Sequence, residues 1–509
     1  MENDKPLKIY NSLTRDLVEF KPINPPQVKM YVCGPTVYDF LHVGNFRGPV
    51  VYNFIRNWLE FLGYQVDFAL NFTDVDDKII QRAKSLNVNP AEHTEKFIEE
   101  YKKDFNSLGL VPHNYNPKVT ETMPEIIQFV DRLIEKQKAY VVEKEESKKD
   151  VLYSIESFSE YGKLSGRKTE ELMAGARVEV DEKKKNPMDF ALWKGSKSDE
   201  LSWASPWGQG RPGWHIECSA MIHKIFGDQI DIHGGGTDLI FPHHENEIAQ
   251  SEGLTGKKLA QYWIHVGMLN FAGQKMSKSL GNLVSLREFV EKNHAEIYKY
   301  MILSSHYRSV AEFSEGTLHQ SISSLARIYS VLSRAERLMN KSENLEGLEN
   351  LEGLQQFKNK LQDKIKSLEE KKSSDVFYKN IQKSLDQMIR ALNDDFGTPA
   401  AFAVIFDLVR QFNVDFPNLL GVSLEKKERA VFYSEFIKAF GNILALFQEP
   451  SHQFLKDLDD LLLKQLNVDR AVVDKMVSER VQAREKKDYK KSDELRDQLK
   501  SLGISVMDS

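Results

Sequence analysis

The segment Met30–Arg47, MYVCGPTVYDFLHVGNFR, constrains the fold of this chain most, because it joins a strand end, a turn and a helix start. The apolar run Val28–Cys33 predicts a buried strand, and the Gly-Pro pair after it predicts a turn. The corner at residues 42–45, HVGN, opens a helix whose apolar residues recur at helical spacing over Pro49–Tyr64. Unpaired amides converge at such a helix start and attract phosphate. The segment therefore predicts a phosphate-binding corner at the carboxyl edge of a parallel sheet.

Length and composition limit the possible classes of protein. A chain of 509 residues is too long for one core, so we expect several domains. It has no apolar leader and no run of about 18 apolar residues, which predicts a cytoplasmic protein with no membrane association. Two cysteines cannot form a disulfide framework, so they are candidate metal ligands or catalytic residues. A formal net charge of −6 argues against indiscriminate nucleic-acid binding, although a local basic surface could still engage a polyanion.

A second strand, Gln65–Phe72, completes a β-α-β unit and runs into Thr73, Asp74, Asp76 and Asp77. Capping of the next helix accounts for any one of these aspartates. Because the carboxyl ends of parallel strands share one edge of the sheet, we expect Thr73 to face a substrate there.

The chain changes character between about residues 120 and 205. The charge runs EKEESKK (143–149) and DEKKK (181–185) flank short strand-like pieces such as VLYSI, and no catalytic constellation is visible. We interpret this region as an insertion between two halves of a nucleotide-binding fold. The second half resumes near Trp214 and contains a short buried strand, Ile230–His233.

A glycine triplet follows that strand at Gly234, Gly235 and Gly236. Without side chains the backbone approaches a ligand closely, as a nucleotide requires; a flexible turn is the equal alternative.

Four residues from separate segments form a candidate metal site. Cys33, Cys218, His243 and Glu247 supply two sulfurs, a nitrogen and an oxygen, a set that suits Zn²⁺ better than Mg²⁺ or Ca²⁺. His243 and Glu247 are four residues apart and share a helix face. Taken singly, each cysteine could be a buried apolar residue and the histidine could be solvated. His244, three residues before Glu247, competes with His243 as the nitrogen ligand.

The pentapeptide KMSKS, residues 275–279, follows the apolar segment YWIHVGMLNF. Its two lysines place positive charge where the bridging oxygens of a triphosphate become negative as pyrophosphate leaves. Such pentapeptides are often solvated loops, but the strand before this one favours a functional loop.

Together these motifs resemble the cysteinyl-tRNA synthetases, a family of class I aminoacyl-tRNA synthetases. CGPTVYDFLHVGN resembles the first signature of the family, and KMSKS matches the second. NFTDVDDKI, GWHIECSAM and GGGTDLIFPHHENEIAQ resemble its internal blocks. The resemblance covers most of the first 300 residues. It implies an α/β fold in which a Rossmann-like parallel-sheet catalytic domain is split by a connective insertion and followed by mainly α-helical tRNA-binding domains and a small C-terminal module.

The resemblance also implies the functional residues. The catalytic residues would be His42, Asn45, Lys275 and Lys278, and cysteine would be bound by Cys33, Gly34, Thr73 and Trp214. The ATP site would comprise Gly34, Pro35, His42, Gly44, Asn45, Gly235, Gly236, Asp238 and Lys278. Zn²⁺, one ion per subunit, would bind Cys33, Cys218, His243 and Glu247, and Mg²⁺ would accompany ATP.

One residue departs from the family pattern. The class signature ends in a second histidine, and this chain has Asn45 in its place. An amide still donates a hydrogen bond to phosphate but carries no positive charge. We therefore expect His42 and the lysine loop to carry more of the transition-state stabilisation.

The motifs and the resemblance together predict the following organisation. Residues 1–120 and 206–270 form the two halves of the Rossmann domain, 121–205 the insertion, 271–325 the KMSKS loop and stem-contact region, 326–455 a helical anticodon-stem-binding domain, and 456–509 an anticodon-side module. Helices are expected over Leu286–Ser304 and Thr317–Met339, and in the last helix Leu495 and Leu499 should point inward before Gly503 ends it.

The implied activity is that of a cysteine–tRNA ligase. Cysteine reacts with ATP to give cysteinyl-adenylate and pyrophosphate, and the aminoacyl group passes to the 3′-terminal ribose of tRNA(Cys). Zinc would select the substrate thiol over the serine hydroxyl, so no editing domain is expected. We expect a monomer. The alternatives are a cysteine ligase that uses an amino-sugar acceptor and a non-catalytic tRNA-binding paralogue.

Overall fold

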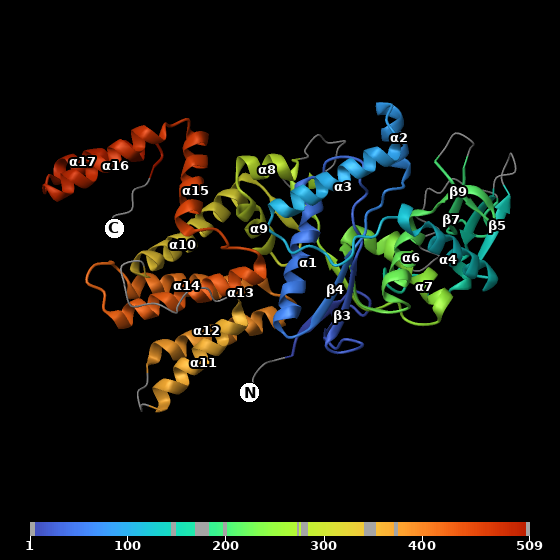
Figure 1. Cartoon of the computed structure of the whole chain (residues 1–509), viewed down its shortest axis with the longest axis horizontal. Helices are drawn as coiled ribbons and strands as arrows, with labels where there is room; N and C mark the ends of the chain where they lie inside the picture. The colour runs from blue at the N-terminus through green and yellow to red at the C-terminus, as the bar shows by residue number, and fades with distance from the viewer. Residues whose placement is uncertain are drawn as a thin grey trace. The chain divides into compact units, whose positions relative to one another are not determined.

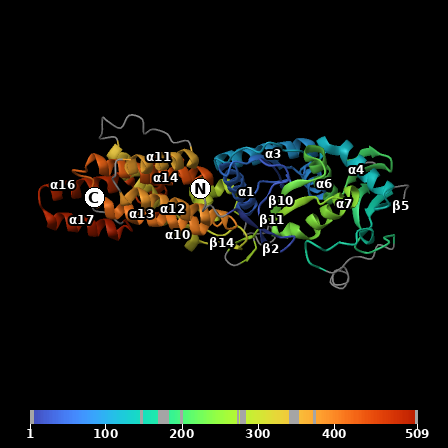
Figure 2. The ribbon, with the colours of Figure 1, turned by 90° about the horizontal axis from the view of Figure 1, so that it is seen from below.

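The computed structural model describes residues 6–143, 149–167, 183–196, 201–271, 274–275, 284–339, 353–370 and 375–504. Its helices and strands appear in Figure 1, and a view from below in Figure 2. The chain forms two compact units, each described here by itself. The first comprises Met1–Leu286, Ile302–Ser314 and Asp386–Ala401, and the second comprises Arg287–Met301, Glu315–Leu385 and Phe402–Ser509.

A four-stranded parallel sheet forms the centre of the first unit. Its strand order is β11 (Ala260–Val266), β10 (Ile230–Gly236), β3 (Gln27–Val32) and β4 (Gln65–Leu70). The sheet lies between α1 (Val43–Phe61) on one side and α6 (Trp214–Phe226) and α7 (Glu245–Thr255) on the other, as Figures 1 and 2 both show. The prediction of a parallel-sheet α/β domain is confirmed.

Register places the ends of three strands at one edge of this sheet. Met30 pairs with Phe68 on β4 and with Ile232 on β10, so β3 and β4 end together and β10 continues past them to Gly236. Cys33 follows β3 directly, and its backbone N–H donates to the Gly234 carbonyl at 3.0 Å. The residues that follow each strand therefore meet at the same edge.

Helix α1 begins at Val43, earlier than the apolar pattern from Pro49 indicates. Pro49 lies within its second turn, and the face beyond it is buried, including Phe54, Ile55 and Trp58. Because the helix starts directly after His42, the HVGN corner forms its first turn and faces the edge where the strands end.

An antiparallel five-stranded sheet forms the insertion. Its order is β5 (Ala139–Glu143), β6 (Lys149–Tyr153), β7 (Phe190–Gly195), β9 (Gly208–Pro212) and β8 (Trp203–Ser205). It extends to Pro212, beyond residue 205, where we expected the insertion to end. Most of the EKEESKK run and the first two residues of DEKKK lie outside the described residues. One apolar core joins this sheet to α4 (Met123–Glu135) and α6, with Trp193, Phe129 and Ile216 among its members.

The first unit has further strands and helices. They are β1 (Lys8–Asn11), β2 (Asp16–Glu19), α2 (Asp77–Leu86), α3 (Pro90–Ser107), β12 (Leu269–Phe271), β13 (Gln274–Lys275) and β14 (Ala311–Phe313), with 3-10 turns at 120–122, 155–157 and 237–239 and a short π-helical segment at 240–244. Strand β12 pairs antiparallel with β13 and parallel with β14.

The second unit is helical. Its elements and those that lead into it are α8 (Leu286–Lys292), α9 (Ala295–Leu303), α10 (Glu315–Met339), α11 (Leu354–Glu370), α12 (Val376–Asn393), α13 (Thr398–Asp415), α14 (Leu424–Leu444), α15 (Ser451–Leu466), α16 (Arg470–Glu485) and α17 (Tyr489–Ser501). The single helix expected over Leu286–Ser304 is wrong, because His294, with φ +128°, separates α8 from α9. In α17, Leu495 and Leu499 are buried as expected, and Gly503 follows with φ +80°. No helix among the described residues is both long and apolar enough to cross a bilayer.

His113 makes the stability of the first unit sensitive to pH. Its ring packs against Phe68 and Phe105, with ring centroids 4.7 and 4.8 Å away, and burial followed by the charge of Arg56 lowers its pKa to about 4. The unfolded chain binds a proton below about pH 6.5, but the folded chain does so only near pH 4. The contribution of neutral His113 to the free energy of unfolding is therefore fully present above pH 6.5. It is lost as the pH drops towards 4, by about 3 kcal/mol in all.

The melting temperature of wild-type protein should therefore drop between pH 7.5 and pH 5. His113→Gln, which cannot be protonated, should show a smaller drop. His319→Gln, at an exposed position, serves as the control and should behave as wild type. An equal drop in His113→Gln and wild type would contradict the assignment.

Candidate active site and metal centre

The four predicted metal ligands converge at the end of β3. The Cys33 Sγ lies 3.6 Å from the Cys218 Sγ and 3.3 Å from the Glu247 Oε1. The His243 Nε2 lies 3.0 Å from the same Glu247 oxygen. One ligand atom from each of the four residues lies within 4.8 Å of the others, so a single ion could contact all of them. We call these four residues the Cys218 set.

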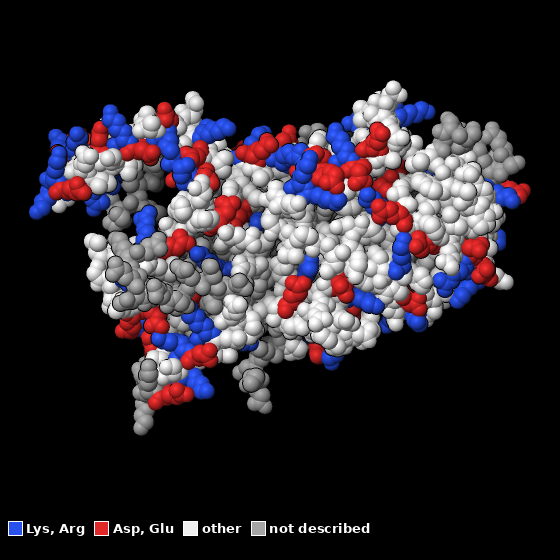
Figure 3. All heavy atoms as spheres, in the orientation of Figure 1, with Lys and Arg blue, Asp and Glu red and all other residues white. Residues whose placement is uncertain are grey.

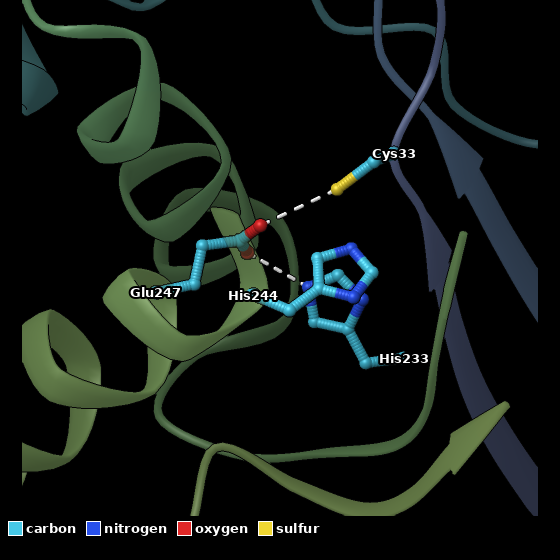
Figure 4. Close-up of side chains that lie close together, drawn as sticks. All are labelled: Cys33, His233, His244 and Glu247. Atoms are coloured by element: carbon cyan, nitrogen blue, oxygen red, sulfur yellow. Dashed lines mark hydrogen bonds and ion pairs between the residues drawn. The ribbon is translucent and has the colours of Figure 1, made fainter. Parts of the chain in front are cut away.

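A second group overlaps the first. Cys33, His233, His244 and Glu247 also bring their ligand atoms within 4.8 Å of one another, and Figure 4 shows them facing a common centre. We call these four the His244 set. His233 Nε2 lies 2.7 Å from Glu247 Oε2, and His244 Nδ1 lies 2.9 Å from His265 Nε2. His244 is therefore a structural alternative to His243 as a metal ligand, as the sequence indicated.

Opposite charges are paired within this buried cluster. Burial would raise the pKa of Glu247, but His233 and His243 hold it well below its usual range. Burial would lower the pKa of His243, but the Glu247 carboxylate and Cys218 raise it to about 10. A hydrogen bond with Cys33 lowers the pKa of Cys218 to about 6, whereas burial raises that of Cys33. A positively charged His243 thus balances the Glu247 carboxylate, and Zn²⁺, which binds neutral imidazole and thiolate, would take the place of that proton.

Two buried nitrogens at the same place lack a hydrogen-bond partner among the described residues. These are His244 Nε2 and His233 Nδ1. Unpaired buried polar atoms are rare in proteins and are commonly explained by a missing ion or water. These nitrogens belong to the His244 set, whereas the two sulfurs, the imidazole and the carboxylate of the Cys218 set are the donor combination that fits a zinc ion.

The residues expected to bind cysteine surround the cluster. Gly34 follows Cys33 and lies against Asn71; a Cβ on Gly34 would be 1.7 Å from the Asn71 carbonyl oxygen, so only glycine fits. Thr73 is buried, and its backbone N–H donates to the Pro35 carbonyl at 3.2 Å. The Trp214 ring, 39% exposed, stacks on His243 with centroids 4.2 Å apart. The four residues predicted to bind the substrate cysteine thus lie next to the metal cluster.

A cavity of about 290 Å³ begins at the same strand end. Every described residue of the predicted ATP site lines it: Gly34, Pro35, His42, Gly44, Asn45, Gly235, Gly236 and Asp238. Cys33 lines it too and so belongs to both the cavity and the metal cluster. Lys275 ends β13, and its side chain is not described; Lys278 lies outside the described residues.

The HVGN corner has a capping function as well as a position at the cavity. The backbone N–H of His42 donates to the Asn45 Oδ1 at 3.1 Å, as in a capping box. The amide oxygen of Asn45 is thereby engaged, and its NH₂ group is the part that could donate to a phosphate.

Several residues of the site were missed from the sequence. His233 stands alone on a buried strand, one residue before the glycine triplet, and only that position signalled it. His215 Nδ1 lies 3.0 Å from His243 Nδ1. Tyr52 accepts a hydrogen bond from the Gly235 N–H at 2.7 Å, and Arg47 lines the cavity.

Three stretches of the chain match known protein families. Residues 19–323 match the family described as tRNA synthetases class I (C) catalytic domain. Residues 387–448 match the DALR domain, and residues 470–509 match the cysteinyl-tRNA ligase anticodon binding domain.

Full-length relatives agree with these matches. The chain is 56% identical over 503 residues to the cysteine–tRNA ligase of Bdellovibrio bacteriovorus, covering 99% of this chain and 98% of the relative. It is 42% identical to that of Thermodesulfovibrio yellowstonii and 41% identical to that of Halalkalibacterium halodurans, with 99% of this chain covered in both and 98% and 97% of the relatives.

Solved structures show the same fold at low identity. The Mycobacterium tuberculosis methionyl-tRNA synthetase in complex with methionyl-adenylate matches with a TM-score of 0.60 and 14% identity, covering 84% of this chain and 93% of that structure. A second structure of that enzyme bound by methionyl-adenylate matches with a TM-score of 0.59 and 12% identity, over 82% of this chain and 92% of that structure. On the evidence of its domains and its full-length relatives, the chain belongs to the cysteine–tRNA ligases, a family of class I aminoacyl-tRNA synthetases.

Proposed function

We propose that the protein activates L-cysteine with ATP, releasing pyrophosphate, and then transfers cysteine from the adenylate to the 3′-terminal ribose of tRNA(Cys). The observation that carries this proposal is the double position of Cys33, which lines the nucleotide cavity and belongs to the buried cluster of thiols, imidazoles and carboxylate. A substrate whose thiol reached the cluster would have its carboxylate near the cavity. This is the arrangement that adenylation of cysteine needs.

The residues of the chain contribute positioning and charge. The substrate carboxylate attacks the α-phosphate, and the leaving pyrophosphate carries the new negative charge. The first turn of α1 presents its amides and Asn45 to the cavity, while Gly235 and Gly236 allow the nucleotide to approach the backbone closely. Lys275 and Lys278 are proposed to balance the charge on pyrophosphate, with Mg²⁺ accompanying the ATP.

We assign zinc, one ion per subunit, to the Cys218 set, because two sulfurs favour Zn²⁺ more than the single sulfur of the His244 set does. When bound, the ion supplies a soft position that prefers a thiol to the hydroxyl of serine. Within this assignment His233 holds the Glu247 carboxylate in place through its 2.7 Å contact. Thr73 and Trp214 would contact the rest of the amino acid.

The acceptor is proposed to be tRNA, not an amino sugar. The match of residues 470–509 to an anticodon binding domain supports this choice, as do relatives that are similar over the full length. Lys and Arg side chains gather over α16 and α17, at the upper left of Figure 3, where a polyanion could bind. The same match disfavours the amino-sugar ligase.

The test is cysteine-dependent exchange of radiolabelled pyrophosphate into ATP by the zinc-loaded protein. We expect exchange that requires cysteine and is not supported by serine or alanine. A zinc-loaded, folded protein without exchange would refute the proposal, and the non-catalytic paralogue would replace it.

Asn45 provides a test of the nucleotide corner. Asn45→Ala removes both the capping contact to the His42 N–H and the NH₂ donor, so we expect a loss of about 1 kcal/mol in stability and about a 10-fold slower exchange, the effect of one lost hydrogen bond. Asn45→Asp keeps the capping acceptor but removes the donor and adds negative charge. Asn45→Asp should therefore be as stable as the wild type, but its exchange should be slower than that of Asn45→Ala. Wild-type exchange rates in both variants would show that Asn45 does not act on the nucleotide.

A further inference from the structure

Arg47, one turn beyond the HVGN corner, bridges two backbone segments at the nucleotide cavity through hydrogen bonds. The residue is only 2% exposed. Its Nη1 donates to the carbonyl oxygens of Gly267, at 2.7 Å, and Met268, and its Nη2 donates to the carbonyl oxygen of Ser309 at 2.6 Å. A single guanidinium group thus bridges the segment after β11 and the segment before β14.

The two segments pass so closely that their carbonyl groups converge. A Cβ on Gly267 would lie 2.2 Å from the Ser309 oxygen, so glycine is needed there. The Gly267 N–H donates to the Tyr307 carbonyl at 2.8 Å, and the Ala311 N–H donates to the Met268 carbonyl at 2.9 Å. A planar group with several fixed donors suits such a cluster of oxygens, whereas the single ammonium of lysine cannot reach both segments with the same geometry.

This crossing lies at the wall of the nucleotide cavity. Gly267, Met268 and Leu269 line the cavity, as does Arg47 itself. Leu269 begins β12, which pairs with β13, and Lys275 ends β13. Arg47 lies in α1, five residues after the N-cap residue His42. Its hydrogen bonds therefore fix the HVGN corner relative to the opposite wall and to the base of the lysine segment.

We propose that Arg47 is a positioning residue for adenylate formation: it sets the relative position of the HVGN corner and the 267–269 wall around ATP. The inference rests on the proposed function, since it concerns the adenylation step. Misplacement of reacting groups by about 1 Å can slow a reaction about 10²-fold, so loss of this link should appear in the rate of the chemical step.

Arg56 offers a matched control on the same helix. Its Nη1 donates to the Pro112 carbonyl at 2.7 Å, and its Nε bonds to Glu60 at 2.9 Å, so it too ties α1 to a neighbouring segment. It is 9% exposed and does not line the cavity. If Arg47 acted only by supporting the fold, Arg47→Met and Arg56→Met should have the same consequences.

The experiment is rapid-quench measurement of the first enzyme-bound cysteinyl-adenylate, with zinc-loaded protein, cysteine, ATP and pyrophosphatase. The amplitude reports the fraction of active protein and the rate constant reports the chemical step. For Arg47→Met we expect a rate constant about 10²-fold lower with the amplitude kept, and for Arg47→Lys about 10-fold lower. Arg56→Met should keep the wild-type rate constant.

Two results would overturn the inference. One is a wild-type rate constant with reduced amplitude in both Arg47 variants, because this is what a purely structural role gives. The other is an equal slowing in Arg56→Met. If Arg47→Met does not fold, Arg47→Lys decides alone, since it keeps the buried charge. Absence of adenylate from wild-type protein would instead refute the proposed function, so the two failures are distinguishable.

Discussion

Replacement of Cys218 by serine should abolish zinc binding and cysteine activation together. Serine differs from cysteine only in having oxygen, a smaller atom, in place of sulfur, but its hydroxyl holds its proton and is a poor zinc ligand. We expect the zinc content of the purified variant to fall well below one ion per chain. We also expect kcat/KM for cysteine in pyrophosphate exchange to fall at least about 10²-fold, because loss of a residue that only supports a metal ligand already lowers metal affinity or activity 10- to 100-fold. Metal analysis and exchange kinetics on the same sample measure both.

His244→Asn is the matched control, because it removes a buried imidazole of the His244 set and leaves the Cys218 set intact. It should retain zinc and most cysteine activation. The reverse pattern, with zinc retained in Cys218→Ser and lost in His244→Asn, would show that the His244 set holds the metal.

Removal of zinc from the wild-type protein should abolish the discrimination between cysteine and serine. Sites that bind a polar group of the correct substrate reject an analogue by about 10⁴- to 10⁵-fold, whereas a pocket that only accommodates the side chain reaches about 10²-fold. We expect the ratio of kcat/KM values for cysteine and serine to fall from the first range to the second after chelation, chiefly through loss of activity with cysteine.

The measurement is pyrophosphate exchange with each amino acid before chelation, after chelation, and after zinc is restored. Recovery of the original ratio on zinc addition is the control for irreversible damage. A ratio that zinc removal leaves unchanged would move the source of selectivity from the metal to the protein pocket around Thr73 and Trp214.

The parallel sheet and most residues of the candidate site could be predicted from the sequence. Apolar runs predict β3 and β4 because central parallel strands are buried on both faces, and the helical repeat predicts the body of α1. The HVGN corner, the glycine triplet and the Cys218 set lie where strands of the sheet end or next to it, so recognising the strands also brings these residues together.

Residues whose partners lie far away in the sequence could not be predicted. A buried arginine such as Arg47 looks like a surface residue of an amphipathic helix, because the carbonyl groups that hold it belong to segments more than 200 residues away. His233 carries no local signal beyond its strand, since its partner Glu247 lies on another element. The break at His294 between α8 and α9 has neither glycine nor proline to mark it.

The most direct test of the account is the charging of tRNA(Cys) by the purified protein, supplied with cysteine and ATP, with zinc bound and after its removal. The account predicts cysteinyl-tRNA from the zinc-loaded protein, little from the zinc-free protein, and recovery when zinc is restored. Cysteine-dependent pyrophosphate exchange without transfer to any tRNA would contradict it and favour a ligase with another acceptor, and equal charging with and without zinc would contradict the role given to the metal.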